Sequence, residues 1–205
     1  MSRIASRDAA LVRVTGRLSR SDLLWVANTA HGPGGHWHAR VRGGEPDHDH
    51  LASPEAAMRY LADHSVPVLD EPPDQVALAE LGVVRTMVHR LLSPGADPWT
   101  DEGRALLAAA RYALDTEGQI ACTQTGWRRF CRDLLVPLFA LAENRAGLRR
   151  CANPACRLLF EDGSPNHARR WCDTAGCGNR DRVRRARSRY AVAPMSRAQP
   201  GASNP

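Results

Sequence analysis

The sequence predicts a mainly α-helical protein that ends in a small cysteine-bearing module, and three observations support this fold class. Apolar residues recur at helical spacing, capping residues precede several of the apolar runs, and four cysteines gather near the C-terminal end. We expect a helical N-terminal domain with short strands over residues 1–145, a compact module ending in a basic helix over 146–190, and a disordered tail over 191–205.

The first helices are predicted from the residues that cap them. Ser21-Asp22 precedes an apolar run, and a second helix spans about 53–63, with serine as its N-cap and proline at its first position. The segment LVRVT at 11–15 is compatible with a short strand. Residues 31–50 contain many glycines and histidines, so we expect a polar loop there.

The longest helix is predicted to open at the proline pair of residues 72–73 and to run to about Leu92. Thr100 caps another helix through about Leu114, and residues 117–125 carry β-branched side chains that favour a short strand. The last helix of this domain covers 127–144, where Pro137 should introduce a kink. The apolar stripe of the longest helix comprises Val76, Leu81, Val84, Val88 and Leu91.

Positive charge is concentrated in the cysteine-bearing module. All 28 basic residues are arginines, and the chain has a formal net charge of +6. Residues 1–144 hold 15 arginines and 18 acidic residues, whereas residues 145–190 hold 12 arginines and 4 acidic residues. Because arginine binds phosphate through a planar, bidentate fork, this asymmetry indicates a module that faces nucleic acid.

The four cysteines of the module form two pairs with the same internal spacing. Each pair reads C-x4-C, and a 15-residue insert at 157–171 separates the pairs. This spacing is typical of a zinc ribbon or knuckle, in which two short turns supply the corners of a tetrahedron. Disulfides, unconnected thiols and an iron–sulfur cluster are the alternatives. We expect one structural zinc ion held by Cys151, Cys156, Cys172 and Cys177.

The two remaining cysteines, Cys122 and Cys131, lie outside the pattern, and we expect them to be ordinary core thiols. A module of about forty residues buries little apolar surface, so the metal should be what folds it.

The module resembles the CGNR-type zinc finger of bacterial proteins. The matching positions are Cys151-Ala152-Asn153-Pro154, Cys156, Phe160, Asp162, Ser164, Asn166, Arg170-Trp171-Cys172 and Cys177-Gly178-Asn179-Arg180. In that family the finger follows a helical domain called ABATE. Here Leu24 and Val26 with Asn28-Thr29, and Asp49-x-Leu51 with Ser53-Pro54, resemble its early segments. The resemblance implies a zinc-binding, DNA-binding protein of transcription regulation and stress response.

Arginines on the helix after the motif are the candidate DNA contacts. We expect Gly178 to Tyr190 to be helical, with a packing stripe of Val183, Ala186 and Tyr190. Two further arginines precede Cys172, although neutralising the tetrathiolate site is an alternative role for Arg170 and Arg180. The candidate DNA-binding residues are Arg169, Arg170, Arg180, Arg182, Arg184, Arg185, Arg187 and Arg189.

Three residues of the motif are assigned structural roles. We expect Gly178 to form part of the second knuckle turn and Trp171 to pack over the hairpin. Asn179 has an amide that could read adenine, but capping the helix or bonding the knuckle backbone is the favoured role.

These observations favour a cytoplasmic transcription regulator that is not an enzyme. Its expected partners are double-stranded DNA, a second copy of the chain, and a small-molecule or protein effector sensed by the helical domain; no membrane partner is expected. The alternative is a zinc-stabilised protein- or RNA-interaction module. A metal or hydrolase site at His36-Trp37-His38 and His48-Asp49-His50 is the third hypothesis, against which we expect a solvated loop.

Overall fold

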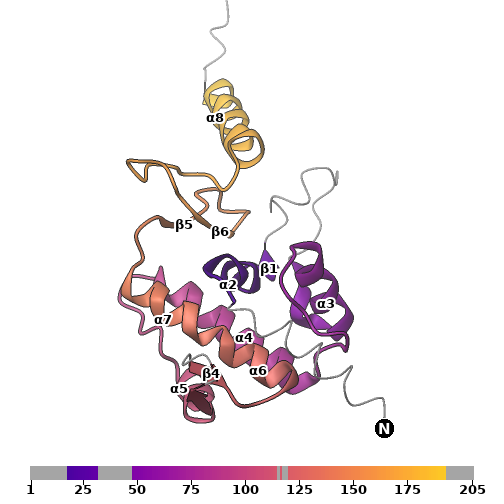
Figure 1. The fold of residues 1–205 in the computed structure, drawn as a ribbon. Helices are drawn as coiled ribbons and strands as arrows, with labels where there is room; N and C mark the ends of the chain where they lie inside the picture. The colour runs from indigo at the N-terminus through magenta and orange to yellow at the C-terminus, as the bar shows by residue number, and fades with distance from the viewer. Residues whose placement is uncertain (1–17, 32–47, 115, 117–119, 193–205) are drawn as a thin grey trace, which may run out of the picture.

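The computed structural model describes residues 18–31, 48–114, 116 and 120–192, and it confirms the mainly α-helical fold class (Figure 1). Helix α4 (Gln75–Leu91) is central among the helices of the body. It contacts α2 (Arg20–Ala27), α6 (Gly126–Asp133) and α7 (Leu135–Glu143). The largest fully buried side chains include Leu81, Phe130 and Leu138. These helices therefore enclose one hydrophobic core.

The N-cap of helix α2 lies two residues earlier than predicted. Ser19, not Ser21, is the N-cap: its hydroxyl accepts the amide of Asp22 at 3.2 Å, and the Asp22 carboxylate accepts the Ser19 amide at 2.7 Å. The prediction was wrong because this reciprocal capping box satisfies two helix-end groups at once, whereas Ser21 lies inside the helix. Residues 11–15 lie outside the described part of the chain.

The predicted polar loop at 31–50 begins and ends in paired backbone. Strand β1 (Ala30–His31) pairs antiparallel with β2 (His48–Asp49), and a 3-10 turn, η2 (His50–Ala52), follows. The segment between the strands, including His36-Trp37-His38, is outside the described residues. Helix α3 (Pro54–Asp63) begins as predicted, with the Ser53 hydroxyl accepting the Ala56 amide at 3.2 Å.

The apolar face of α4 is rotated slightly from the predicted stripe. Asp74 caps the helix, and its buried face includes Ala77, Leu81 and Met87. Val76 is 53% exposed, so its inclusion in the stripe was wrong. As the second residue of α4, it lies about 100° around the helix from the buried Ala77.

Thr100 caps α5 (Asp101–Ala108) as predicted, but this helix ends earlier than Leu114. Residues Tyr112–Leu114 form β3, which pairs antiparallel with β4 (Ile120–Cys122) in the region predicted to contain a strand. The cross-strand pairing supplies backbone hydrogen bonds that end the helix six residues before the predicted position.

The predicted helix over 127–144 is two helices. Leu134 is the C-cap of α6 and the N-cap of α7, and it lies three residues before Pro137. Proline has no amide hydrogen to donate to the carbonyl of Asp133, so a continuous helix would lose a bond at this point. The expected kink is thus a break that lets α6 and α7 both pack on α4.

The cysteine module is docked on the helical body through its hairpin. Strand β5 (Leu148–Arg150) pairs antiparallel with β6 (Leu159–Glu161), and Leu148 and Leu159 belong to the same core cluster as the body helices. The buried side-chain amide of Asn28 donates to the Leu159 carbonyl at 2.9 Å, and its oxygen accepts the Leu159 amide at 2.8 Å. Hairpin and body therefore share one interior.

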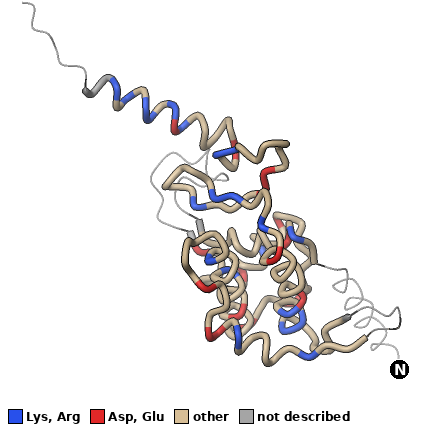
Figure 2. Tube along the Cα trace, turned by 90° about the vertical axis from the view of Figure 1, so that its left-hand side faces the viewer, with Lys and Arg blue, Asp and Glu red and all other residues tan. Residues whose placement is uncertain are grey.

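The chain continues beyond the hairpin into a projecting helix. A π-helical turn, η3 (Thr174–Gly178), leads directly into α8 (Asn179–Val192). Figure 2 shows α8 extending away from the helical body, with arginines along its length. The helix continues two residues into the region where the tail was predicted, and residues 193–205 lie outside the described chain.

Candidate metal centre

The four cysteines of the module converge on one point. Their Sγ atoms all lie within 4.8 Å of one another, and they form the one group of three or more potential metal ligands among the described residues. The Cys156 and Cys172 sulfurs are 3.6 Å apart, and those of Cys172 and Cys177 are 3.7 Å apart. The two C-x4-C pairs therefore form a single site, as the spacing predicted.

The first pair sits on a turn at the tip of the β5–β6 hairpin. The Cys151 amide donates to the Leu158 carbonyl at 2.8 Å, and the Cys156 amide donates to the Asn153 carbonyl at 2.9 Å. The Asn153 side chain accepts the Ala155 amide at 3.2 Å and donates to the Cys177 sulfur at 3.5 Å. Asn153 thus shapes the first turn and also connects it to the second cysteine pair.

The second pair sits on a turn organised by Asp173. Its carboxylate accepts the amides of Ala175 at 3.1 Å and Gly176 at 2.8 Å, and its carbonyl accepts the Gly178 amide at 3.0 Å. These bonds hold the backbone of η3 so that the Cys177 sulfur points back towards the first pair.

Gly178 is needed because Trp171 packs directly on it. A Cβ atom at this position would lie 3.0 Å from Trp171 Cδ1. Trp171 is half-buried against a small cluster made by Cys151, Cys156, Cys177 and their neighbours. The indole therefore covers the metal-binding turns, and its predicted packing over the hairpin agrees with this position.

Four thiols this close share protons unequally. Hydrogen bonds from Cys156, Cys172 and Cys177 lower the pKa of Cys151, whereas the bond to Cys151 raises the pKa of Cys172. The Cys151 thiolate is thus stabilised by its three neighbours, whereas Cys172 is held in its protonated form. A divalent cation would replace the shared protons and balance two of the four thiolate charges, which leaves a formal charge of −2 on the site.

The donor set fits zinc. Four thiolates at the usual Zn–S distance of about 2.3 Å define a tetrahedron whose edges are about 3.8 Å. The Cys156–Cys172 and Cys172–Cys177 sulfur separations lie within 0.2 Å of that edge. Because cysteine sulfurs occupy all four positions, the site is of the closed, structural kind. Cys151, Cys156, Cys172 and Cys177 therefore form a site for one structural zinc ion.

The two arginines before Cys172 are engaged with the module itself. Arg169 donates to the Trp171 carbonyl at 2.8 Å and to the Cys172 carbonyl, and its guanidinium lies 5.1 Å from the centre of the Phe160 ring. The Arg170 guanidinium lies 5.0 Å from the Trp171 ring centre. Their predicted contacts with DNA stay predictions, but both side chains already stabilise the turn that carries the second cysteine pair.

The arginines of α8 have a different environment. Arg182, Arg184, Arg185, Arg187 and Arg189 are exposed, and Arg180 is half-buried. Asp181, only 6% exposed, pairs with Arg184 and with Arg185, the latter at 2.7 Å. Asn179 begins the helix and its side-chain oxygen accepts from Arg182 at 3.4 Å. With six arginines and one aspartate, the helix carries a net charge of +5.

The described histidine-loop residues do not gather into a second metal site. Asp49 is bound by Arg85, whose two terminal nitrogens lie 2.6 and 3.0 Å from its carboxylate oxygens. His50 stacks on Tyr60 with ring centres 4.3 Å apart. These contacts tie the segment to α3 and α4, although the His36-Trp37-His38 half of the hypothesis lies outside the described residues.

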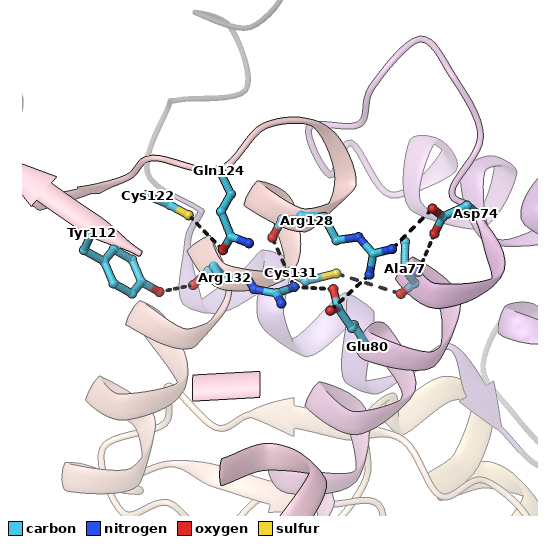
Figure 3. Close-up of polar contacts among 9 residues, drawn as sticks. All are labelled: Asp74, Ala77, Glu80, Tyr112, Cys122, Gln124, Arg128, Cys131 and Arg132. Carbon is cyan, nitrogen blue, oxygen red and sulfur yellow. Dashed lines mark hydrogen bonds and ion pairs between the residues drawn. The ribbon is translucent and has the colours of Figure 1, made fainter. Parts of the chain in front are cut away.

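A charged cluster in the body joins α4 to α6 (Figure 3). Arg132 is 3% exposed and pairs with Glu80, which also pairs with Arg128 at 3.1 Å; Arg128 lies 3.4 Å from Asp74. Cys131 donates to the Ala77 carbonyl at 3.8 Å, and burial raises the pKa of its thiol. The charges of the two carboxylates and the two guanidiniums balance. Cys131 and Cys122 are both buried, as predicted. The Arg132–Glu80 pair is a buried connection between α4 and α6, whereas Asp74 at the start of α4 is exposed.

The fold and the tetrathiolate site define a small zinc module attached to a helical body. Residues 148–190 match the model of the CGNR zinc finger family, a segment that starts with β5, contains all four cysteines and ends within α8. A comparison with curated proteins found no match. The ABATE-like character of residues 1–145 stays a prediction.

Sequence reasoning missed the roles of three residues that build the site or hold it on the body. Asp173 follows Cys172 directly, and aspartate at the start of a turn is a recognisable signal for the backbone bonds it accepts. The role of Asn153 was visible only as turn chemistry, not as a bond to sulfur. Asn28 bonds a residue 131 positions away, and no local pattern predicts that contact.

Proposed function

We propose that this protein is a DNA-binding transcription regulator whose zinc module presents α8 to double-stranded DNA. The observation that carries the proposal is the projection of a helix of net charge +5 from a metal-fixed turn. Its arginines from 182 to 189 are exposed. Guanidinium groups bind phosphate oxygens bidentately, so such a helix is suited to the phosphate backbone.

Zinc supplies rigidity in this proposal. When bound, it crosslinks the hairpin turn to η3, and η3 continues into α8 without an intervening loop. The direction of α8 is therefore set by the cysteine turns, and the hairpin in turn is fixed to the body by Asn28 and the shared core. A helix held in one direction loses less conformational entropy on binding than a helix joined to the body by a flexible linker.

The helical body would act as a sensor or as an oligomerisation unit, and the protein would not be an enzyme. Its charge supports a division of roles, because residues 1–144 carry a net charge of −3 while the positive charge lies in the module. DNA is thereby attracted to one end of the molecule. None of the described helices combines the length and apolar composition that a membrane crossing requires. We place the protein in the cytoplasm with its DNA target.

The experiment is a titration of labelled duplex DNA with the zinc-loaded full chain at several salt concentrations. If about four phosphates are engaged, log K should fall with log salt at a slope near −3.6. In Arg187→Gln/Arg189→Gln, two phosphate contacts are removed, so the slope should become shallower by about 1.8. Neither residue pairs with a carboxylate in the described structure, so folding should be unaffected.

The matched control is Arg59→Gln/Arg111→Gln, which removes two exposed charges from the body. It should leave the slope within experimental error of the wild type. Equal effects of the two double variants would show that net charge alone drives association. Absence of salt-dependent binding to any duplex, or preferential binding to single-stranded RNA, would overturn the proposal.

A further inference from the structure

The apolar stripe of α8 faces solvent instead of packing on the protein. Val183 is 42% exposed and Ala186 is exposed, whereas their spacing predicted burial. The extensive contacts of α8 are with η3, at its first turn, and the helix extends away from the body (Figures 1 and 2). The side chain of Tyr190, the third member of the predicted stripe, lies outside the described part. Among the side chains of α8 that the structure describes, the uncharged edge includes Val183 and Ala186.

Two rows of arginines flank this edge. One row is Arg180, Arg184 and Arg187, and the other is Arg182, Arg185 and Arg189; within each row the residues are three or four apart and so share a face. The two rows lie on opposite sides, because two residues along a helix correspond to a rotation of about 200°.

The opposite edge of the helix is occupied by a carboxylate. Asp181 is nearly buried and is paired with one arginine from each row, Arg184 and Arg185. On a helical projection, Val183 and Ala186 lie on the side away from Asp181. A polyanion that approaches the edge formed by Val183 and Ala186 is therefore farthest from the Asp181 carboxylate and has a row of arginines on each side.

These features select one occupant for the edge. A second α8 would bring two helices of charge +5 together, which disfavours a coiled dimer. A membrane surface would gain little from one valine and one alanine. The major groove of duplex DNA, by contrast, is about 12 Å wide, admits a helix, and has phosphates on both sides of a floor of base edges.

On the basis of the proposed function, we infer that α8 lies in the major groove with Val183 and Ala186 against the base edges and the two arginine rows towards the two phosphate strands. The arginines then supply affinity that is independent of sequence. Val183 and Ala186 supply apolar contact, and the one apolar group that a base presents in this groove is the methyl of thymine. Thymine is the base that this edge recognises.

The test begins with selection of bound sequences from random duplexes by the zinc-loaded full chain. Each thymine of the selected site is then replaced by uracil, which removes only the methyl group. For the wild type, at least one such replacement should weaken binding about threefold to fourfold, the effect of one buried methyl-sized group. Val183→Ala should weaken binding to the selected site about threefold to tenfold and leave binding to a random duplex unchanged.

The decisive comparison is the combination of the two changes. If the valine contacts a thymine methyl, uracil replacement at that position should have little further effect on Val183→Ala. Val136→Ala, at an exposed valine of α7, is the control and should behave as the wild type does. Because the uracil series uses wild-type protein, it remains informative even if a variant folds poorly.

Three results would overturn the inference. Uracil replacement without effect at every position, or with equal effect in wild type and Val183→Ala, would remove the thymine contact while leaving DNA binding through the arginines intact. Dissociation of a protein dimer by Val183→Ala would assign the edge to a second copy of the chain. Failure of the wild type to bind any duplex would instead remove the proposed function and this inference together.

Discussion

At the scale of single residues, Gly147 shows how closely the chain must approach itself where the body joins the metal module. Its φ of 78° lies in the left-handed region, and a Cβ atom there would lie 2.9 Å from the Asp162 carbonyl oxygen. Gly147→Ala should therefore cost about 1–3 kcal/mol of unfolding free energy, measured by urea denaturation of the zinc-loaded protein. Gly163→Ala, where a Cβ meets nothing within 4 Å, should change it by at most about 0.5 kcal/mol. Similar losses in both variants would contradict this explanation.

A second residue-scale prediction concerns His89, which lies between the body and the hairpin. Its Nε2 is 2.9 Å from the Ala27 carbonyl, so the neutral ring can donate there. Burial lowers the pKa of His89, the bond to Ala27 opposes this shift, and the charges of Arg150 and Arg85 lower the pKa further. The folded state thus binds fewer protons than the unfolded state. The contribution of neutral His89 to the unfolding free energy is fully present above the ordinary pKa of 6.5 and is lost as the pH falls below it.

The unfolding free energy should consequently decrease by up to about 1.4 kcal/mol per pH unit below this value because of His89 alone. The measurement is denaturation of wild type and His89→Gln at a series of pH values. Protonation of the cysteine site and of His64, whose pKa is also lowered by burial, affects both proteins. The difference between the two curves therefore isolates His89. Parallel curves would show that His89 does not titrate in this range.

At the scale of elements, local sequence signals predicted where most helices begin. The features that these signals did not predict depend on contacts between residues far apart in the sequence. Ser53 and Thr100 cap their helices as expected because a cap needs only neighbouring residues. The cysteine spacing also sufficed for the metal site, since each turn is local and zinc imposes one geometry. The early end of α5 and the docking of β6 on Asn28 depend on partners distant in sequence.

The helix α8 was located correctly, but the environment of its apolar stripe was not. Periodicity shows that Val183 and Ala186 share an edge, and in most helices such an edge packs on the protein's own core. It does not show what covers the edge. With the helix projecting from η3, the stripe is exposed between two rows of arginines, and this arrangement became visible only in three dimensions.

At the scale of the whole molecule, the metal module and the body should not unfold independently. Leu148 and Leu159, on either strand of the hairpin, are 1% and 2% exposed within the core that the body helices build. Loss of zinc should release the hairpin tip first, because the cluster around the cysteines contains little else that is apolar. Separation of the hairpin base would then expose both leucines and leave the buried amide of Asn28 without its partners.

Chelation of the metal should therefore destabilise the body as well as the module. Exposure of two leucines costs at most about 3–6 kcal/mol, and loss of the two Asn28 bonds adds about 1–3 kcal/mol. Hydrogen exchange of α2 amides, measured with and without chelator, should reveal this coupling as faster exchange in the apo protein.

In the loaded protein Asn28→Ala should mimic part of the effect, and after chelation the same substitution should change exchange little, because Leu159 is no longer held there. Asn166→Ala, at an exposed position of the module, should have no effect in either state. Unchanged α2 protection after complete metal removal would mean that the hairpin remains docked through its leucines alone, and the zinc site would then direct α8 without stabilising the body.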